Sequence, residues 1–305
     1  MLTGAAFSVF IDRGSAAESA GLTWEAAPPP DAGSGREYRA TAQILILSVP
    51  LVRWPNVGGG SSVWRETAMP GGGVLRYLEF TGFSNPEHAA GLNRLGFIRE
   101  ISRAAGSDPE SLYFGLMTAS PEETAEEARR ALNSKAKQAA YTAIDGRLTG
   151  GSVETVVAHF EAPANWSVAN RKDLVQLART ALMMTTPRPL EGDPGGAAVR
   201  PFLETLATSL RQPGNTETRF AYGGRFYRLT LEKTPDPKAS ASFRERGLVS
   251  ARSEVLRVSG KLRREQGGKE TTFRLWVEQG AARPLPLRIE YQAKSYLRLI
   301  FEAEA

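Results

Sequence analysis

The last third of the chain, from about Thr216 onward, alternates apolar and polar residues with a period of two. Successive side chains of a β-strand point to opposite faces, so this alternation predicts strands with one buried face. Glycine pairs separate the runs at short intervals, which favours hairpin connections. The pattern therefore predicts an antiparallel β-meander that is core on one side and solvated on the other. In each expected strand, every second residue should be buried. These residues are Thr218, Phe220 and Tyr222; Tyr227, Leu229 and Leu231; Leu256, Val258 and Leu262; Phe273, Leu275 and Val277; Leu285, Leu287, Ile289 and Tyr291; and Leu297, Leu299 and Phe301.

Charged residues occupy the opposite parity of this meander. They are Arg257, Lys261, Arg263, Arg274, Glu278, Arg288, Glu290, Arg298 and Glu302. Residues 216–305 hold 18 Lys and Arg against 11 Asp and Glu, whereas the whole chain has a formal net charge of +5. The glutamates interleave the arginines, as in cross-strand charge pairs, and the sequence lacks the aromatic-glycine signature of a base-stacking sheet. We therefore expect a solvated face and no nucleic-acid partner; contact with phosphates of an anionic polymer or of lipid headgroups is the alternative.

The first two thirds of the chain mix strand and helix signals. The expected strands are Glu37–Val49, Ser62–Ala68, Val74–Phe83, Arg94–Ser102, Ser111–Thr118, Tyr141–Leu148 and Val153–Phe160. Two glycine-rich segments between them, Asn56–Ser62 and Gly71–Gly73, are expected to be turns. One helix is expected to begin at Ser120, which opens a capping box with Glu123, and two more extend over Val168–Met184 and Ala197–Leu210. The segments Thr185–Gly196 and Lys233–Gly247 are expected to be loops.

Strands precede the helices and strands follow them, so one sheet can close over the helical middle of the chain. We expect a single α+β domain over residues 36–305, with a split at residues 185–196 as the alternative. Residues 1–35 are expected to form a flexible leader that contains Pro28–Pro30. The mildly apolar start is cut short by Asp12 and Arg13, which makes it a poor export signal. A cytoplasmic protein and an exported one whose true start lies outside this sequence both remain open.

No catalytic constellation is visible in the sequence. The chain has no cysteine, which excludes disulfides, thiolate metal sites and cysteine nucleophiles. Its two histidines, His88 and His159, lie in no nucleophile or metal-ligand motif, so we expect surface or structural roles, no metal and no cofactor. The run Val57–Ser62 lacks the Gly-Lys-Ser/Thr ending of a phosphate-binding loop. No apolar stretch approaches the roughly 18 residues that a transmembrane helix needs.

Two runs in the meander carry a resemblance to a known family. They are the aromatic strand Phe273–Val277 and the segment Arg283–Tyr291 with its Leu-Pro-Leu-Arg-Ile motif; Phe220–Tyr227 is compatible with the same pattern. Over about the last 90 residues, the chain resembles the domain-of-unknown-function 3108 family of bacterial envelope proteins. The resemblance implies a periplasmic or otherwise extracytoplasmic protein with a lipoprotein-carrier-like fold, in which a large curved antiparallel β-sheet, a half-barrel, wraps around a few helices. It implies no catalytic residues.

These observations lead to the expectation of a non-catalytic bacterial envelope protein that binds a lipid or a lipoprotein acyl group in the concave face of the sheet. The expected ligand-binding residues are Leu229, Leu275, Leu287, Leu299 and Phe202. The same side chains can fill a closed core instead, which we favour over an open pocket. The alternatives are a hydrolase that uses paired carboxylates and a module that binds anionic polymers through the basic face. Association with a membrane surface is a further expectation, and the oligomeric state is not indicated.

Overall fold

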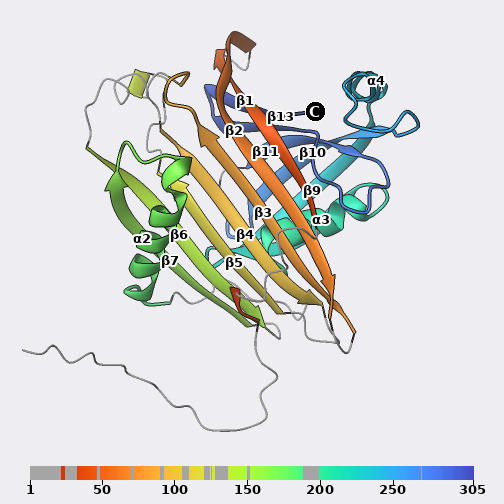
Figure 1. The fold of residues 1–305 in the computed structure, drawn as a ribbon. Helices are drawn as coiled ribbons and strands as arrows, with labels where there is room; N and C mark the ends of the chain where they lie inside the picture. Colours follow the sequence, from red (N-terminus) through yellow and green to blue (C-terminus); the bar gives the residue numbers. More distant parts are fainter. Residues whose placement is uncertain are drawn as a thin grey trace, which may run out of the picture.

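The computed structural model describes residues 22–24, 33–46, 49–69, 72–89, 93–104, 110–119, 124, 126–127, 137–149, 152–187, 199–268 and 270–305. Strands dominate these residues (Figure 1). The first seven strands are β1 (Gly33–Ile46), β2 (Val49–Ala68), β3 (Val74–Ser84), β4 (Leu95–Ala104), β5 (Glu110–Thr118), β6 (Gln138–Thr149) and β7 (Ser152–Pro163). The others are β8 (Thr216–Tyr222), β9 (Arg225–Pro235), β10 (Val255–Arg264), β11 (Thr271–Glu278), β12 (Arg288–Lys294) and β13 (Leu297–Ala303). The helical elements are η2 (Val168–Asn170), α2 (Arg171–Met183), α3 (Phe202–Arg211) and α4 (Pro237–Glu245).

All thirteen strands belong to one sheet, in the order β7-β6-β5-β4-β3-β2-β1-β13-β12-β11-β10-β9-β8. Every pair of neighbouring strands is antiparallel, as the alternation in the sequence predicts. Strands β1–β7 and β8–β13 are two meanders, and they meet at a seam where β1 pairs with β13. The seam runs from Tyr38 opposite Ala303 to Ile44 opposite Leu297. It joins the first and the last described strands, and with them the two meanders, into a single sheet.

The sheet curls into a nearly closed barrel, further than the half-barrel that we expected (Figure 1). Its edges are β7 and β8, and no ladder joins them in the part of the chain that the structure describes. Side chains close the gap instead. Tyr113 of β5 and Val157 of β7 share one apolar cluster with Ala221 of β8 and Phe226 of β9. The β8–β9 hairpin therefore packs against the inner side of β5–β7 without extending the ladder.

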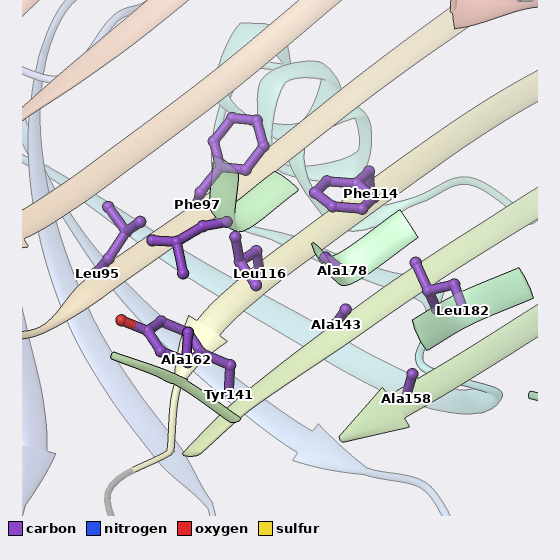
Figure 2. Packing of buried hydrophobic residues seen from close by; sticks show 11 residues of the cluster. Leu95, Phe97, Phe114, Leu116, Tyr141, Ala143, Ala158, Ala162, Ala178 and Leu182 are labelled. Carbon is purple, nitrogen blue, oxygen red and sulfur yellow. The ribbon is translucent and has the colours of Figure 1, made fainter. Parts of the chain in front are cut away.

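Among the described helices, α3 alone lies in the concavity, which corrects the expectation of several enclosed helices. Leu174, Ala178 and Leu182 of α2 meet side chains of β4–β7. Figure 2 shows Ala178 and Leu182 in this packing. Those sheet residues alternate with the ones that face β8 and β9, so α2 covers the convex face. Small residues of the sheet, Ala143 and Ala158, let α2 approach closely. On the convex side of β10 and β11, Phe243 of α4 packs with Val255, Trp276 and Leu287.

The predicted turn at Asn56–Ser62 is wrong, because these residues lie inside β2, a strand of 20 residues. The glycines are required by close backbone approach rather than by a turn. A Cβ atom on Gly58 would lie 1.9 Å from the carbonyl oxygen of Phe83, and one on Gly60 would lie 2.6 Å from that of Thr81. Gly60 also leaves room for the ring of Phe301, which reaches across the seam. Glycine in a strand often marks such an approach.

The predicted loop Lys233–Gly247 is also wrong, since it contains the end of β9 and all of α4. Asp236 caps this helix by accepting a hydrogen bond from the backbone N–H of Ala239, and Pro237 occupies the first helical position. The other strands and the helices α2 and α3 lie close to their predicted ranges. The helix predicted from Ser120 falls outside the described residues, apart from Thr124, Glu126 and Glu127.

Candidate functional site

The concave face was the expected ligand site, and α3 occupies it. Phe202, Leu206 and Leu210 of this helix pack against strands β8–β11. The strand residues of that cluster are Phe220, Leu229, Leu231, Val258, Leu275 and Val277, all of them buried. Leu229 has no exposed surface at all. Burial of side chains of this size stabilises a fold by roughly 1.5–3 kcal/mol each. This part of the concavity is therefore core.

A buried carboxylate on β4 caps the beginning of α3. The Oε1 atom of Glu100 accepts a hydrogen bond from the backbone N–H of Leu203 at 2.7 Å, and its Oε2 atom accepts one from Glu204 at 2.8 Å. The N-cap residue of the helix is Pro201, which has no side-chain acceptor. Glu100 therefore satisfies backbone donors that a Ser, Thr, Asn or Asp would otherwise satisfy.

A lysine on β9 binds the other end of α3. The Nζ atom of Lys233 donates to the carbonyl oxygens of Ser209, at 2.6 Å, and of Gln212. Burial lowers the pKa of Lys233. A cation at the end of a helix complements the helix macrodipole. Two strands from different halves of the sheet thus hold the helix from both ends, and we call this arrangement the α3 clamp.

Glu100 and Glu204 are a pair of buried carboxylates, exposed by 1% and 4%. Burial, opposed by the backbone amides and reinforced by the nearby Glu204, raises the pKa of Glu100 from 4.5 to about 8. Glu204 accepts a hydrogen bond from Ser111 and lies 3.5 Å from guanidinium nitrogens of both Arg76 and Arg200. The partners of both carboxylates are thus protein groups, which suits an anchor better than a reacting acid.

Two tyrosines fill the space between β5 and β8 next to the α3 clamp. The rings of Tyr113 and Tyr222 lie 5.3 Å apart, and the Tyr113 hydroxyl is 2.6 Å from that of Thr155. Glycines make room for both: a Cβ atom on Gly146 would lie 2.0 Å from the Cζ atom of Tyr113, and one on Gly115 would lie 2.0 Å from the Tyr222 hydroxyl. Burial raises the pKa of Tyr113 to about 12 and raises that of Tyr222 as well.

The structure does not bring all the predicted ligand residues together. Leu229, Leu275 and Phe202 share the cluster beneath α3, whereas Leu299 packs near the seam. Leu287 does not face the concavity, as we expected; it is buried on the convex side beneath α4. It precedes β12, which begins at Arg288, so the strand parity does not extend to it. Sequence reasoning missed Glu100 and Lys233, since charged residues in alternating strands normally face solvent.

A groove of about 900 Å³ opens at the rim of the barrel, and two of its lining residues, Ala282 and Leu285, contact α3. Its lining residues are Ser34, Gly35, Arg36, Glu37, Glu278, Ala282, Arg283, Leu285, Glu304 and Ala305. Leu285 also packs with the buried cluster of Trp64 and Leu78, so the floor of the groove continues into the core. Burial, and then the negative charge of Glu304, raise the pKa of Glu37. The groove thus presents guanidinium and carboxylate groups beside an apolar floor.

The expected charge pairs are present on the outer face of the C-terminal meander. Glu290 forms ion pairs with Arg274 at 3.6 Å and with Arg288, and Arg288 also lies 3.2 Å from Glu302. His88 and His159 are both exposed. Within the described ranges, no group of three or more His, Asp or Glu side chains is placed to hold a metal ion. No helix in the same ranges is long and apolar enough to cross a membrane.

One solved structure, a beta-barrel-like protein of the domain of unknown function DUF1849 from Brucella abortus, aligns with 88% of this chain and with 95% of its own length. The sequence identity is 8% and the TM-score is 0.41, so the likeness bears on neither the site nor the function. No protein-family model matches the chain, so the comparison with family models does not support the resemblance to the domain-of-unknown-function 3108 family. No curated protein matches the sequence either.

Proposed function

We propose that the protein is a non-catalytic module of the bacterial envelope that binds the zwitterionic headgroup of a lipid in the rim groove. The observation that carries the proposal is the composition of this groove: about 900 Å³ lined by Arg36 and Arg283 together with Glu37 and Glu278. Its volume lies in the usual range for small-molecule sites. Guanidinium groups bind phosphate and carboxylates bind an ammonium group, while Leu285 offers an apolar contact for the glycerol end.

The interior of the sheet is a poorer site for an acyl chain. Leu229 and Leu275 are covered by Phe202 and by other residues of α3, and the clamp residues hold that helix at both ends. A ligand there would have to displace α3 and leave the Glu100 carboxylate and Lys233 without their backbone partners. Leaving such groups unpaired in a buried site costs about 1–3 kcal/mol each. The proposal therefore moves the lipid from the concave face to the rim.

The same geometry favours binding over the two alternatives. A hydrolase needs a carboxylate pair that reaches water and substrate, whereas Glu100 and Glu204 are buried and bound by protein groups. On the outer face of the meander, Arg274 and Arg288 are paired with Glu290, which leaves fewer arginines for an anionic polymer. The envelope location rests on the resemblance of the Arg283–Tyr291 segment.

Two binding measurements test the proposal. Glycerophosphoethanolamine, titrated into the protein in a calorimeter, should bind, and vesicles that contain phosphatidylethanolamine should co-sediment with it. Arg283→Ala and Arg36→Ala should each weaken both signals at least tenfold, since either change removes a phosphate donor. Arg263→Ala, an exposed arginine elsewhere on the sheet, should leave them unchanged. Equal binding by all four proteins, or no binding by the unsubstituted chain, would sink the proposal.

A further inference from the structure

A short segment before β1 lies in a socket on the convex face of the sheet. Leu22 is only 3% exposed there and packs against Leu75, Tyr77, Ile101 and Leu112 of strands β3–β5. The segment is the small red piece beside the sheet in Figure 1. Side-chain and main-chain contacts with the sheet bury it.

Both backbone polar groups of Leu22 are bound by charged side chains of the sheet. Its N–H donates to the Oε2 atom of Glu110 at 2.8 Å, and its carbonyl oxygen accepts from the Nη2 atom of Arg147 at 2.8 Å. Glu110 is itself buried and is held by Arg103 at 2.7 Å and by Arg147 at 3.0 Å. Glu110 and Arg147 thus contact the main chain of Leu22, while the apolar pocket accepts its side chain.

Trp24 adds a second point of contact. Its ring is partly buried and touches two clusters, the one around Leu22 and the one beneath α2. Thr23, between the two apolar residues, is exposed. Main-chain hydrogen bonds that give affinity and side-chain pockets that give specificity are the general elements of peptide recognition.

We propose that this socket is a peptide-binding site for a leucine followed two residues later by an aromatic residue, and that Leu22–Trp24 occupies it as a tethered ligand. The site is separate from the rim groove and goes beyond the headgroup function proposed above. Residues 25–32 join Trp24 to β1 and contain Pro28–Pro30. Because Leu22–Trp24 belongs to the same chain as the socket, its binding is intramolecular. A free peptide of the same sequence must therefore compete with the tethered one.

The test uses the full chain and a fluorescein-labelled peptide with the sequence of residues 19–27. Leu22→Ala weakens the tethered ligand and should make the peptide bind at least tenfold more tightly than to the unsubstituted protein, as measured by fluorescence anisotropy. Thr23→Ala, at the exposed position, should leave the affinity unchanged. Adding Glu110→Gln to Leu22→Ala should reduce peptide binding at least tenfold. The glutamine is a weaker acceptor for the main-chain N–H of the peptide, and it lacks the charge that orients Arg147. A peptide in which Ala replaces the leucine should not bind.

A purely structural role for the segment predicts different results. If folded Leu22→Ala protein, checked by circular dichroism, binds the peptide no better than the unsubstituted chain does, the proposal is overturned. Trp24→Ala removes a side chain that is less buried, so it serves as the second variant should Leu22→Ala fail to fold, with the same expected gain. Peptide binding that survives Glu110→Gln would also overturn the proposal, since the peptide would then lie elsewhere.

Discussion

The two halves of the sheet bury their polar residues in different ways. In β1–β7, Glu79, Glu100 and Glu110 are all buried within strands, exposed by 6%, 1% and 5%, and each is bound by several donors. In β8–β13 most of the charged residues lie on the outer face, where pairs such as Arg228–Glu217 are more than half exposed. Helix α2 covers the convex face of β5–β7 and the β8–β9 hairpin covers their inner face. The outer face of β8–β13 is largely open.

This difference teaches where a charged residue supports the fold. In the first half, carboxylates connect one layer to the next: Glu79 binds Arg171 of α2, Glu100 binds α3, and Glu110 binds Leu22. In the second half, Glu290 is also buried and paired, but exposed pairs such as Arg228–Glu217 exchange water for one another and gain little. The cost of removing a charged side chain should therefore differ strongly between the two halves.

The largest expected effect is that of Glu100→Ala. The substitution leaves the amides of Leu203 and Glu204 buried without an acceptor and opens a void, which should lower the free energy of unfolding by about 3–5 kcal/mol. Glu232→Ala, a carboxylate of β9 whose side chain is 57% exposed, is the matched control and should cost less than about 0.5 kcal/mol. Urea unfolding followed by circular dichroism measures both. Similar losses for the two variants would contradict the comparison.

The pH dependence of stability should follow the same carboxyl group. The pKa of Glu100 is about 8 in the folded chain against 4.5 as the ordinary value, so the native state keeps a proton that the unfolded state releases. Stability should therefore fall as the pH rises from about 4.5 to 8, by at most about 1.4 kcal/mol per pH unit for this one proton. Glu100→Gln does not titrate and should lack this decline. Parallel pH profiles for the two proteins would show that Glu100 is not the responsible group.

Gly146→Ala tests the packing of Tyr113 of β5 against Tyr222 of β8. The new methyl group would overlap the ring of Tyr113, 2.0 Å from its Cζ atom, and should cost about 1–3 kcal/mol of unfolding free energy. Gly96→Ala provides the control on β4, because the nearest atom to its Cβ position is 3.9 Å away. Thermal and urea unfolding should rank the two variants in this order. The reverse order would mean that the tyrosines have room to move.

The smallest expected effect is on the outer face of the second half. Arg228 and Glu217 form an ion pair whose side chains are 56% and 54% exposed. Arg228→Ala, Glu217→Ala and the double variant should give a coupling energy below about 1 kcal/mol that shrinks further in high salt. A coupling energy of several kcal/mol from this double-mutant cycle would remove the distinction between the two halves.

The same difference explains which parts of the fold could be predicted. Strands β8–β13 have an apolar face and a solvated face, so their sequence alternates and their order along the chain is readable. In strand β2, the glycines Gly58 and Gly60 allow the close approach of β3, and composition alone does not distinguish such glycines from those of a turn. Leu287 lies just before β12, where the alternation no longer fixes the face.

The α3 clamp could be predicted only in part. Phe202, Leu206 and Leu210 indicate an amphipathic helix, and the helix is present. Its partner Glu100 gives no signal of its own, because a glutamate in a strand ordinarily faces water. One clue lies in the helix itself. Pro201 at the N-cap has no side-chain acceptor, so an acceptor for the first backbone N–H groups of α3 had to come from elsewhere in the chain. Which strand supplies that acceptor depends on the curl of the whole sheet.

The seam between β1 and β13 has a consequence for how the chain folds during synthesis. The paired side chains of Arg39 and Glu304 on either side of it are 265 residues apart in sequence. Strands β2–β7 can pair with their neighbours as they leave the ribosome, while β1 keeps one unpaired edge until β13 has been made. An unpaired edge strand is a template for association with other chains. We therefore expect the period before the seam closes to be the time at which a nascent chain is most prone to aggregate or to recruit a chaperone.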